Sequence, residues 1–466
     1  MPESARTWID RVFYVWLSVF ALFVVAVFWG LVVDLFRKVV PVRPGEAAPM
    51  LLATAYGFCI LFAFYLLRPV RDEIGAADRG NLQLLWTAVF IVMLLAVPLY
   101  SLAVAKLRRG VFIPLVNRFF ALNLVAFYAA LVLLPESART WIDRVFYVWL
   151  SVFALFVVAV FWGLVVDLFR DDQGKRLFGF ITVGSSLGGI AGSTSTAVLA
   201  PHIPVFLLLL VAVLPLELAA WLARAVARRA DDASAPLNRE PAAPIGGSAW
   251  SGIGPVYRSP ELRNIALWIM LMTFASTILY FVQSHLVGEA ITDRALRRAF
   301  LARIDLAVNT VTIITQTLLT ARIVQRFGVA VTLSALPVVA ALGFLALGAA
   351  PAALALTVLL VVRVLYDSSR HALAKPAREV LFTHLDREQR YKSKAFIDAA
   401  VYRGGDLLSG WIYAGLAALG MSVGAIALSA APVAVLWALL GHRLTWGDKG
   451  TSGQGPSAGA AGKPTA

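Results

Sequence analysis

Charge and cysteine are both scarce in this sequence. Only 15% of the 466 residues are charged, 60% are hydrophobic, and the mean hydropathy is +0.79. A soluble domain of this length needs far more surface charge, so the composition excludes a soluble globular protein. The single cysteine, Cys59, excludes an intrachain disulfide. The five histidines lack the spacing of metal ligands, so we expect no metal and no other cofactor.

The sequence consists largely of long apolar runs. About twelve runs of helix length follow one another from residue 48, and a bilayer-spanning helix needs roughly 20 apolar residues. They lie at 48–69, 82–105, 111–134, 145–168, 177–200, 203–223, 264–287, 301–320, 329–349, 353–367, 395–418 and 421–441. None has the short alternating pattern of a barrel strand. The sequence therefore predicts an all-α polytopic membrane protein that lies in a lipid bilayer.

The formal net charge of +14 comes from basic residues that gather in alternate loops. Because Lys and Arg accumulate in cytoplasmic loops, this alternation predicts that residue 39 and the C-terminus are cytoplasmic in a bacterial inner membrane. It also explains the net charge without a nucleic acid partner. The loop that carries Arg294, Arg297 and Arg298 departs from the rule.

Residues 2–37 repeat residues 135–170 letter for letter. Helix packing does not require such identity, so we interpret the repeat as a recent duplication or an error in the reading of the gene. The copy at 141–170 is tied to its neighbours by short loops, which favours it for the fourth position in the bundle. We expect residues 1–37 to form an extra helix outside the bundle.

A stretch rich in Ala, Pro, Gly and Ser at 229–256 reads as a cytoplasmic linker, with six predicted spans on either side. Residues 444–466 have the same composition and are predicted to be a disordered tail. The pattern of residues 174–181 recurs at 390–397, a shift of 216. We therefore predict two parallel six-helix halves, 38–228 and 257–443, in a major-facilitator-type bundle.

Gly184, Gly188 and Gly192 recur every four residues within one apolar run. This spacing favours close packing of two helices through nearly bare backbone. A phosphate-binding loop would need a following Lys and Ser or Thr, which the sequence lacks here.

Charged residues within the apolar runs are the strongest functional signal. Arg363 and Asp367 lie four residues apart and can pair on one helix face, and Arg403 can pair with Asp406. Such pairs either fix the helix register or line an aqueous pathway, and both interpretations stay open. Basic residues outnumber acidic residues near the predicted openings, which indicates an anionic substrate.

From these positions we predict two sets of site residues. The predicted substrate-binding residues are Arg68, Arg71, Arg118, Lys375, Arg378 and Arg403. The predicted gating or coupling residues are Asp72, Asp305, Arg363, Asp367, Glu379 and Asp406.

Four short motifs lie at 67–72 (LRPVRD), 175–180 (KRLFGF), 375–382 (KPAREVLF) and 402–406 (YRGGD). Together they resemble the bacterial members of the ATP/ADP carrier family of nucleotide transporters, which is related to the major facilitator superfamily. The resemblance covers about residues 39–443. It implies a two-lobed exchanger that swaps ATP for ADP by alternating access. Two features depart from the pattern: Leu84 to Trp86 replace a lysine, and Ser101 and Ala105 replace glycine and aspartate of a loop motif.

The favoured function is therefore a monomeric secondary transporter, not an enzyme, that exchanges nucleotides or another phosphorylated anion. One alternative is a proton-coupled carrier of a small uncharged or amphiphilic solute, with Asp305, Asp367 or Asp406 as the proton site. Another is a non-transporting membrane scaffold. A basic central cavity favours the first function, a lone acidic residue the second, and a plugged centre the third.

Overall fold

The computed structural model describes residues 46–106, 109–169, 171–233, 253–382, 393–394 and 396–443. These residues form helices and short connections, with no strand among them. Within this part of the chain, ten helical segments are long and apolar enough to cross a membrane. The prediction of an all-α, multi-pass membrane protein is confirmed. The expected extra helix at 1–37, the expected disordered tail at 444–466 and linker residues 234–252 lie outside the described residues.

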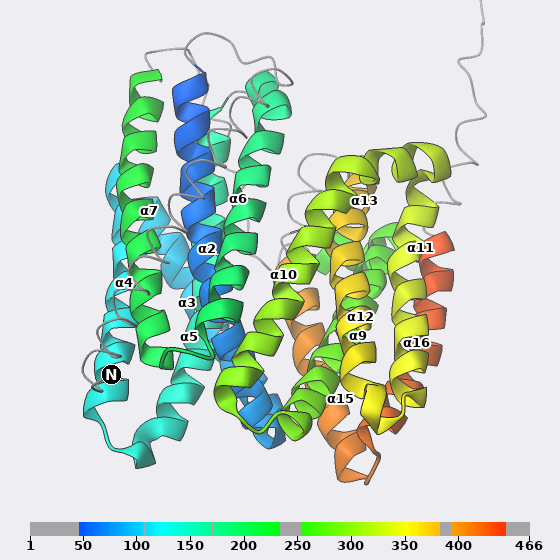
Figure 1. Ribbon diagram of the computed structural model, residues 1–466. Coiled ribbons are helices and arrows are strands. Elements are labelled where there is room, and N and C mark those ends of the chain that lie inside the picture. The colour runs from blue at the N-terminus through cyan, green and yellow to red at the C-terminus, as the bar shows by residue number, and fades with distance from the viewer. Residues whose placement is uncertain are drawn as a thin grey trace, which may run out of the picture.

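Six long helices form a first group (Figure 1, left). They are α2 (Ala47–Ala77), α3 (Leu82–Lys106), α4 (Arg109–Leu133), α5 (Arg139–Leu168), α6 (Asp171–Leu199) and α7 (Val205–Ala233). Helix α5, which is the second copy of the duplicated sequence, packs against α2 and α3. The copy at 139–168 therefore occupies the fourth position in this group.

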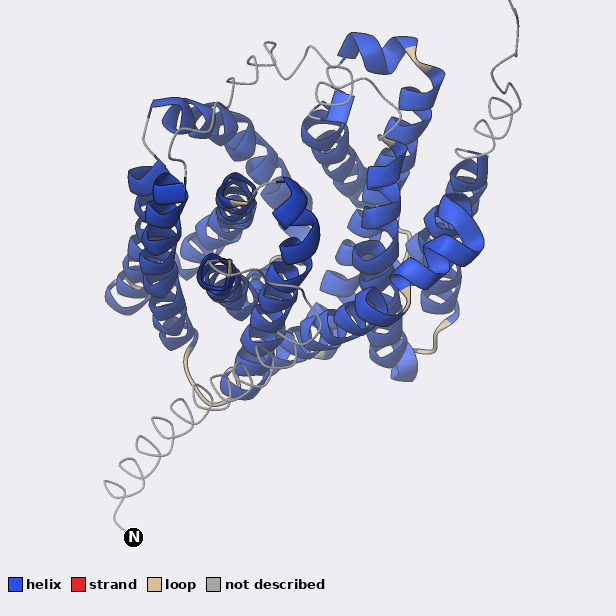
Figure 2. Cartoon of the chain, turned by 90° about the horizontal axis from the view of Figure 1, so that it is seen from above, coloured by secondary structure: helices blue, strands red, loops and turns tan. Residues whose placement is uncertain are grey.

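The second group follows the short helix α8 (Ile253–Arg258). It consists of α9 (Pro260–Ala290), α10 (Arg294–Leu318), α11 (Thr320–Ala349), α12 (Ala355–Ser369), α13 (Lys375–Leu381), α15 (Tyr402–Ala418) and α16 (Val423–Arg443). Two π-helical turns, η5 (Arg370–Ala374) and η6 (Ile397–Val401), precede α13 and α15. Seen from above, the two groups lie side by side (Figure 2).

A short turn determines where α10 begins. The Asp293 side chain accepts a hydrogen bond from the Leu296 backbone N–H at 2.7 Å and so caps the helix. Because the cap fixes the first turn, the three arginines at 294, 297 and 298 fall within the first five residues of α10. The Ser259 side chain caps α9 in the same way, with Pro260 at its first position.

The glycines of α6 bring it into direct contact with α2, as their spacing predicts. A Cβ atom at Gly188 would lie 2.2 Å from the Phe58 carbonyl oxygen, and one at Gly192 would lie 2.4 Å from that of Phe62. Both contacts are with backbone, which cannot rotate away as a side chain does. The glycines therefore set the distance between α6 and α2, the helix that carries the first charged motif.

The two groups approach each other at one end and diverge at the other (Figure 1). They meet where α2 ends and α10 begins, and they separate where α2 begins and α7 ends. Helices α2 and α10, α2 and α9, α6 and α10, and α3 and α15 contact each other across the groups. We call the diverging end the linker side, because α7, the last described helix before the predicted linker, ends there.

Replacing Gly188 with alanine should destabilise the protein, because the added methyl group meets the α2 backbone. Overpacking of a tight contact costs about 1–3 kcal/mol. We expect a clear decrease in the thermal unfolding temperature of the purified protein. Gly179→Ala is the matched control on the same helix, since nothing lies within 4 Å of its added Cβ. That variant should be neutral or slightly stabilising. Equal effects of the two substitutions would contradict the packing role of Gly188.

Candidate functional site

A cavity of about 920 Å³ lies between the two helix groups. Its size suits a small organic molecule. Two acidic side chains, those of Asp398 and Asp406, line it. The basic side chains that line it are Arg68, Arg71, Arg363, Arg370, Lys375, Arg378 and Arg403. We call it the central cavity. Five of the six predicted substrate-binding residues border it, together with two further arginines.

Arg71 is held in place by aromatic side chains. Its guanidinium lies 4.6 Å from the ring centroid of Tyr147, a cation–π distance, and its Nη2 donates to the Tyr147 hydroxyl at 3.4 Å. Trp86 Nε1 also donates to that hydroxyl at 2.9 Å. The Tyr147 hydroxyl donates to Tyr280, which in turn donates to Asp72 at 3.1 Å. This chain of hydrogen bonds joins α3, α5, α9 and α2 around one arginine.

Arg68 links the two groups. Its Nη1 lies 3.0 Å from Asp305 Oδ1 on α10, and its Nε lies 3.6 Å from Asp72 Oδ2 on its own helix. The side chains of both aspartates are almost fully buried. An anion in the cavity that takes Arg68 from Asp305 would leave this buried carboxylate without its arginine, which is costly unless Asp305 moves away.

In the second group, the cavity-lining basic residues continue from α12 into the π-turn η5. Asp367 lies between two arginines, at 2.8 Å from Arg363 and 3.2 Å from Arg370. Arg370 also donates from Nη1 to Ser276 Oγ at 2.8 Å. Sequence reasoning found the Arg363–Asp367 pair but missed Arg370, although its spacing of seven from Arg363 places it near the same face of a helix.

Three more basic residues border the cavity toward the linker side. Lys375 is exposed and, among the described residues, has no carboxylate within ion-pair distance. Arg378 lies 3.2 Å from Asp398 and 3.4 Å from Glu379, and Glu379 also pairs with Lys394.

Arg403, the third of these basic residues, is linked to α9 through Asp406 and Thr277. Arg403 lies 3.7 Å from Asp406, which accepts a hydrogen bond from Thr277 Oγ1 at 3.3 Å. The carboxylates of the predicted gating set therefore contact the cations of the cavity.

Arg118 lies elsewhere. It does not line the central cavity but donates from Nε to Glu217 Oε1 at 3.1 Å, between α4 and α7 of the first group. The two side chains are 38% and 41% exposed. Like Arg363, Arg118 is an arginine within an apolar run, so the sequence around it does not show whether it lines the cavity. That depends on the helix against which it packs.

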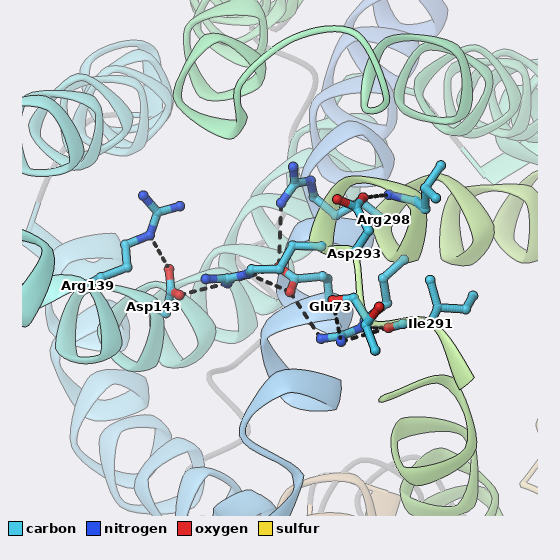
Figure 3. A network of polar contacts seen from close by, with 10 residues as sticks. Glu73, Arg139, Asp143, Ile291, Asp293 and Arg298 are labelled. Atoms are coloured by element: carbon cyan, nitrogen blue, oxygen red, sulfur yellow. Dashed lines mark hydrogen bonds and ion pairs between the residues drawn. The ribbon is translucent and has the colours of Figure 1, made fainter. Parts of the chain in front are cut away.

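The end opposite the linker side is closed by a buried ion-pair cluster (Figure 3). Glu73 at the end of α2 is 1% exposed and contacts three arginines of α10. Arg294 meets it through two hydrogen bonds of 2.8 and 3.1 Å, Arg297 approaches to 3.4 Å and Arg298 to 3.6 Å. Asp143 of α5 also binds Arg294, at 2.7 Å. The cluster joins the two helix groups.

At the same end, α2 and α9 also pack closely through two glycines. A Cβ atom at Gly288 of α9 would lie 2.5 Å from the Ala76 carbonyl oxygen of α2. One at Gly75 would lie 2.9 Å from the Tyr280 hydroxyl. The molecule is thus closed on the side of Glu73, and the central cavity lies on the linker side of Arg71.

No protein-family model and no curated protein matches this chain. Solved structures do match it. The POT family transporter PepTSo superposes with a TM-score of 0.63 at 13% identity, over 88% of this chain and 99% of that chain. The nucleoside transporter NupG gives 0.58 at 12% identity, over 85% and 99%. An auto-inhibited POT family peptide transporter gives 0.57 at 14% identity, over 85% and 96%. At these identities the shared property is the fold, which is of the major facilitator type.

Replacing Glu73 with glutamine should open the closed end, because three arginines then repel one another without their carboxylate. A cysteine at Ser284 reports the change. Ser284 is 2% exposed and lies one turn from both Tyr280 and Gly288, which meet α2. The native Cys59 is buried, so background labelling is low. We expect Ser284→Cys to react with a maleimide several-fold faster in the Glu73→Gln background.

The control for this measurement is Glu217→Gln, which breaks an exposed ion pair within the first group. It should leave the labelling of Ser284→Cys unchanged. If Glu73→Gln leaves the rate unchanged as well, the cluster does not hold this end closed.

Proposed function

We propose that this protein is an alternating-access secondary transporter of organic anions, with phosphorylated solutes such as nucleotides as its first candidates. The observation that carries the proposal is the set of seven basic side chains that line a solute-sized cavity between the two halves of a transporter fold. Alternating access needs a site between two halves that is open to one side at a time. The central cavity and the closed end at Glu73 fit one state of such a cycle.

The charge around the cavity favours an anion. Together with Lys394, the lining cations make eight basic side chains, and six carboxylates contact them. The six are Asp72, Asp305, Asp367, Glu379, Asp398 and Asp406. Among the described residues, an excess of two positive charges remains. Within a cavity, such an excess attracts an anion more strongly than it would on a flat surface in open solvent.

Binding can also be coupled to the movement of the halves. The Arg68–Asp305 pair joins α2 to α10, and an anion that takes the arginine would release Asp305 from it. A ligand shifts a conformational equilibrium only through contacts that differ between the states. The exchange of Asp305 for the substrate at Arg68 would be such a contact.

The nucleotide assignment rests on the resemblance to the ATP/ADP carrier family. The motifs at 67–72, 375–382 and 402–406 supply Arg68, Arg71, Lys375, Arg378 and Arg403, all of which border the cavity. One solved structure with this fold is described as a nucleoside transporter. We further propose that the linker side is cytoplasmic and that the protein works as a monomer in a bacterial inner membrane.

The alternatives have less support. Asp305, Asp367 and Asp406 each contact an arginine, which disfavours a lone acidic proton site for an uncharged solute. A cavity of this volume at the centre of the bundle disfavours a plugged scaffold.

Proteoliposomes test the proposed function. Vesicles loaded with ADP should take up labelled ATP, and unlabelled nucleotides or inorganic phosphate should compete with it. Uncharged nucleosides should compete weakly, because they lack the charge that the cavity attracts. Equal competition by nucleosides and nucleotides, or no uptake of any of these anions, would exclude the proposed substrate class.

Replacing Lys375 with glutamine should weaken anion binding by about threefold to tenfold, the effect of one partly exposed charge. The substitution orphans no carboxylate among the described residues, so the fold should be retained. Lys375→Arg should restore most of the affinity. Arg118→Gln is the matched control, since that cation lies outside the cavity. The measurement is the dissociation constant for ATP in nanodiscs, and equal losses in the Lys375 and Arg118 variants would contradict the site.

A further inference from the structure

One wall of the central cavity carries no charge. It follows a single stripe along α3, at spacings of three and four residues. The stripe consists of Trp86, Phe90, Met93, Leu94, Val97 and Pro98. With a rise of 1.5 Å per residue, it extends for about 18 Å from the deep end of the cavity toward the linker side. Leu155 of α5 adds to it.

The second helix group supplies five of the seven lining cations. From Arg363 to Arg378 the cationic residues run along α12, η5 and α13, a length of about 22 Å at the same rise. The cavity therefore has an apolar wall from α3 of the first helix group and a cationic wall mainly from the second group, with Arg68 and Arg71 of α2 adding two cations. The two walls have similar lengths.

Part of the apolar wall is exposed. Leu94 is 56% exposed and Val97 is 43% exposed, although both border the cavity. Their neighbours Ile91 and Leu95 are also exposed but do not line the cavity. Where such side chains line a cavity, they form a surface that can bind an apolar group.

The composition of the stripe changes along its length. Its aromatic members, Trp86 and Phe90, come first along α3, and the Trp86 ring lies 5.5 Å from that of Tyr280 at the deep end. From Met93 onward the members are aliphatic. A flat nucleobase would cover the aromatic end only. The aliphatic part fits an extended alkyl chain better than it fits any polar portion of a nucleotide.

We propose that the preferred solute of the central cavity is an amphiphilic phosphate with a single alkyl chain. Its phosphate would lie against the cationic wall and its chain along the α3 stripe. This inference rests on the proposed anion transport and narrows the substrate class. Such a molecule could come from the bilayer, as a lysophospholipid, or from solution, as a short alkyl phosphate. Both share the same head and chain chemistry.

Binding measurements in nanodiscs test the proposal with the full chain. The probes are inorganic phosphate, AMP, and butyl, hexyl and octyl phosphate below their micellar concentrations. Transfer of one methylene from water to an apolar site changes affinity by about threefold to fourfold. We expect the affinity to increase along the alkyl series and octyl phosphate to bind more tightly than AMP. Octyl glucoside at the same concentration measures partitioning of the chain alone and should bind weakly.

Two neighbouring leucines provide a matched pair of variants. Leu94→Asn should reduce the gain per methylene, whereas Leu95→Asn should keep it, because Leu95 does not line the cavity. Both side chains are more than half exposed, so neither change should disturb packing. If Leu94→Asn nevertheless fails to fold, Leu94→Ala can replace it. This variant keeps the wall apolar but removes part of its contact surface, so the gain in affinity per methylene should be intermediate.

The outcomes separate the two proposals. An affinity that does not change with chain length, or the same loss for both leucine variants, would overturn the amphiphile inference while phosphate and AMP still bind. Tighter binding of AMP than of octyl phosphate would also overturn it, in favour of a nucleotide. If none of the anions binds, the proposed anion transport fails as well. Lysophosphatidic acid that binds from the bilayer more tightly than octyl phosphate from solution would identify the lipid as the source.

Discussion

A charge buried among apolar helices is costly unless an opposite charge meets it, and the bundle depends on this constraint. Most ion pairs between the described parts of the two helix groups involve α2, namely Arg68 with Asp305 and Glu73 with the arginines of α10, and Asp143 of α5 adds a contact with Arg294. The glycines of α6 hold α2 within its own group through backbone contact. Apolar packing holds each group together, whereas both paired charges and close helix packing join the groups at one end. Where paired charges form part of such a boundary, less apolar surface is exposed when the groups separate than at a wholly apolar contact.

The fold was largely predictable because a transmembrane helix is a local property of sequence. A run of apolar residues is sufficient to predict one, and the runs correspond to the long helices. The start of α10 was not predictable in this way. Arg294, Arg297 and Arg298 read as loop residues that break the positive-inside rule, yet they lie in the first turns of a helix. Their partner, Glu73, is 221 residues away from Arg294, and no local pattern indicates a pairing over that distance.

The candidate site was predictable where charge contrasts with its surroundings. Arg68, Lys375 and Arg403 stand out in apolar sequence, and all three border the cavity. The same contrast misled for Arg118, whose partner Glu217 lies 99 residues away outside the cavity. The contrast between charge and apolar surroundings also could not indicate the α3 stripe, because an apolar residue within an apolar run does not stand out from its neighbours. Which apolar face meets lipid and which meets a cavity depends on tertiary packing alone.

The π-turn η5 sets the helical phase of the cationic wall. In an uninterrupted α-helix, each residue turns the chain by about 100°, so Lys375 would face about 120° away from Arg363. The wider turn at 370–374 rotates less per residue and brings Lys375 and Arg378 back toward the direction of Arg363 and Arg370. Its carbonyls are bonded from outside the helix, that of His371 by Gln316 and that of Ala372 by Thr320. Four cations thus line one cavity because of a single extra residue in one helical turn. The length of this helix is consequently as important to the chemistry of the wall as the charges on it.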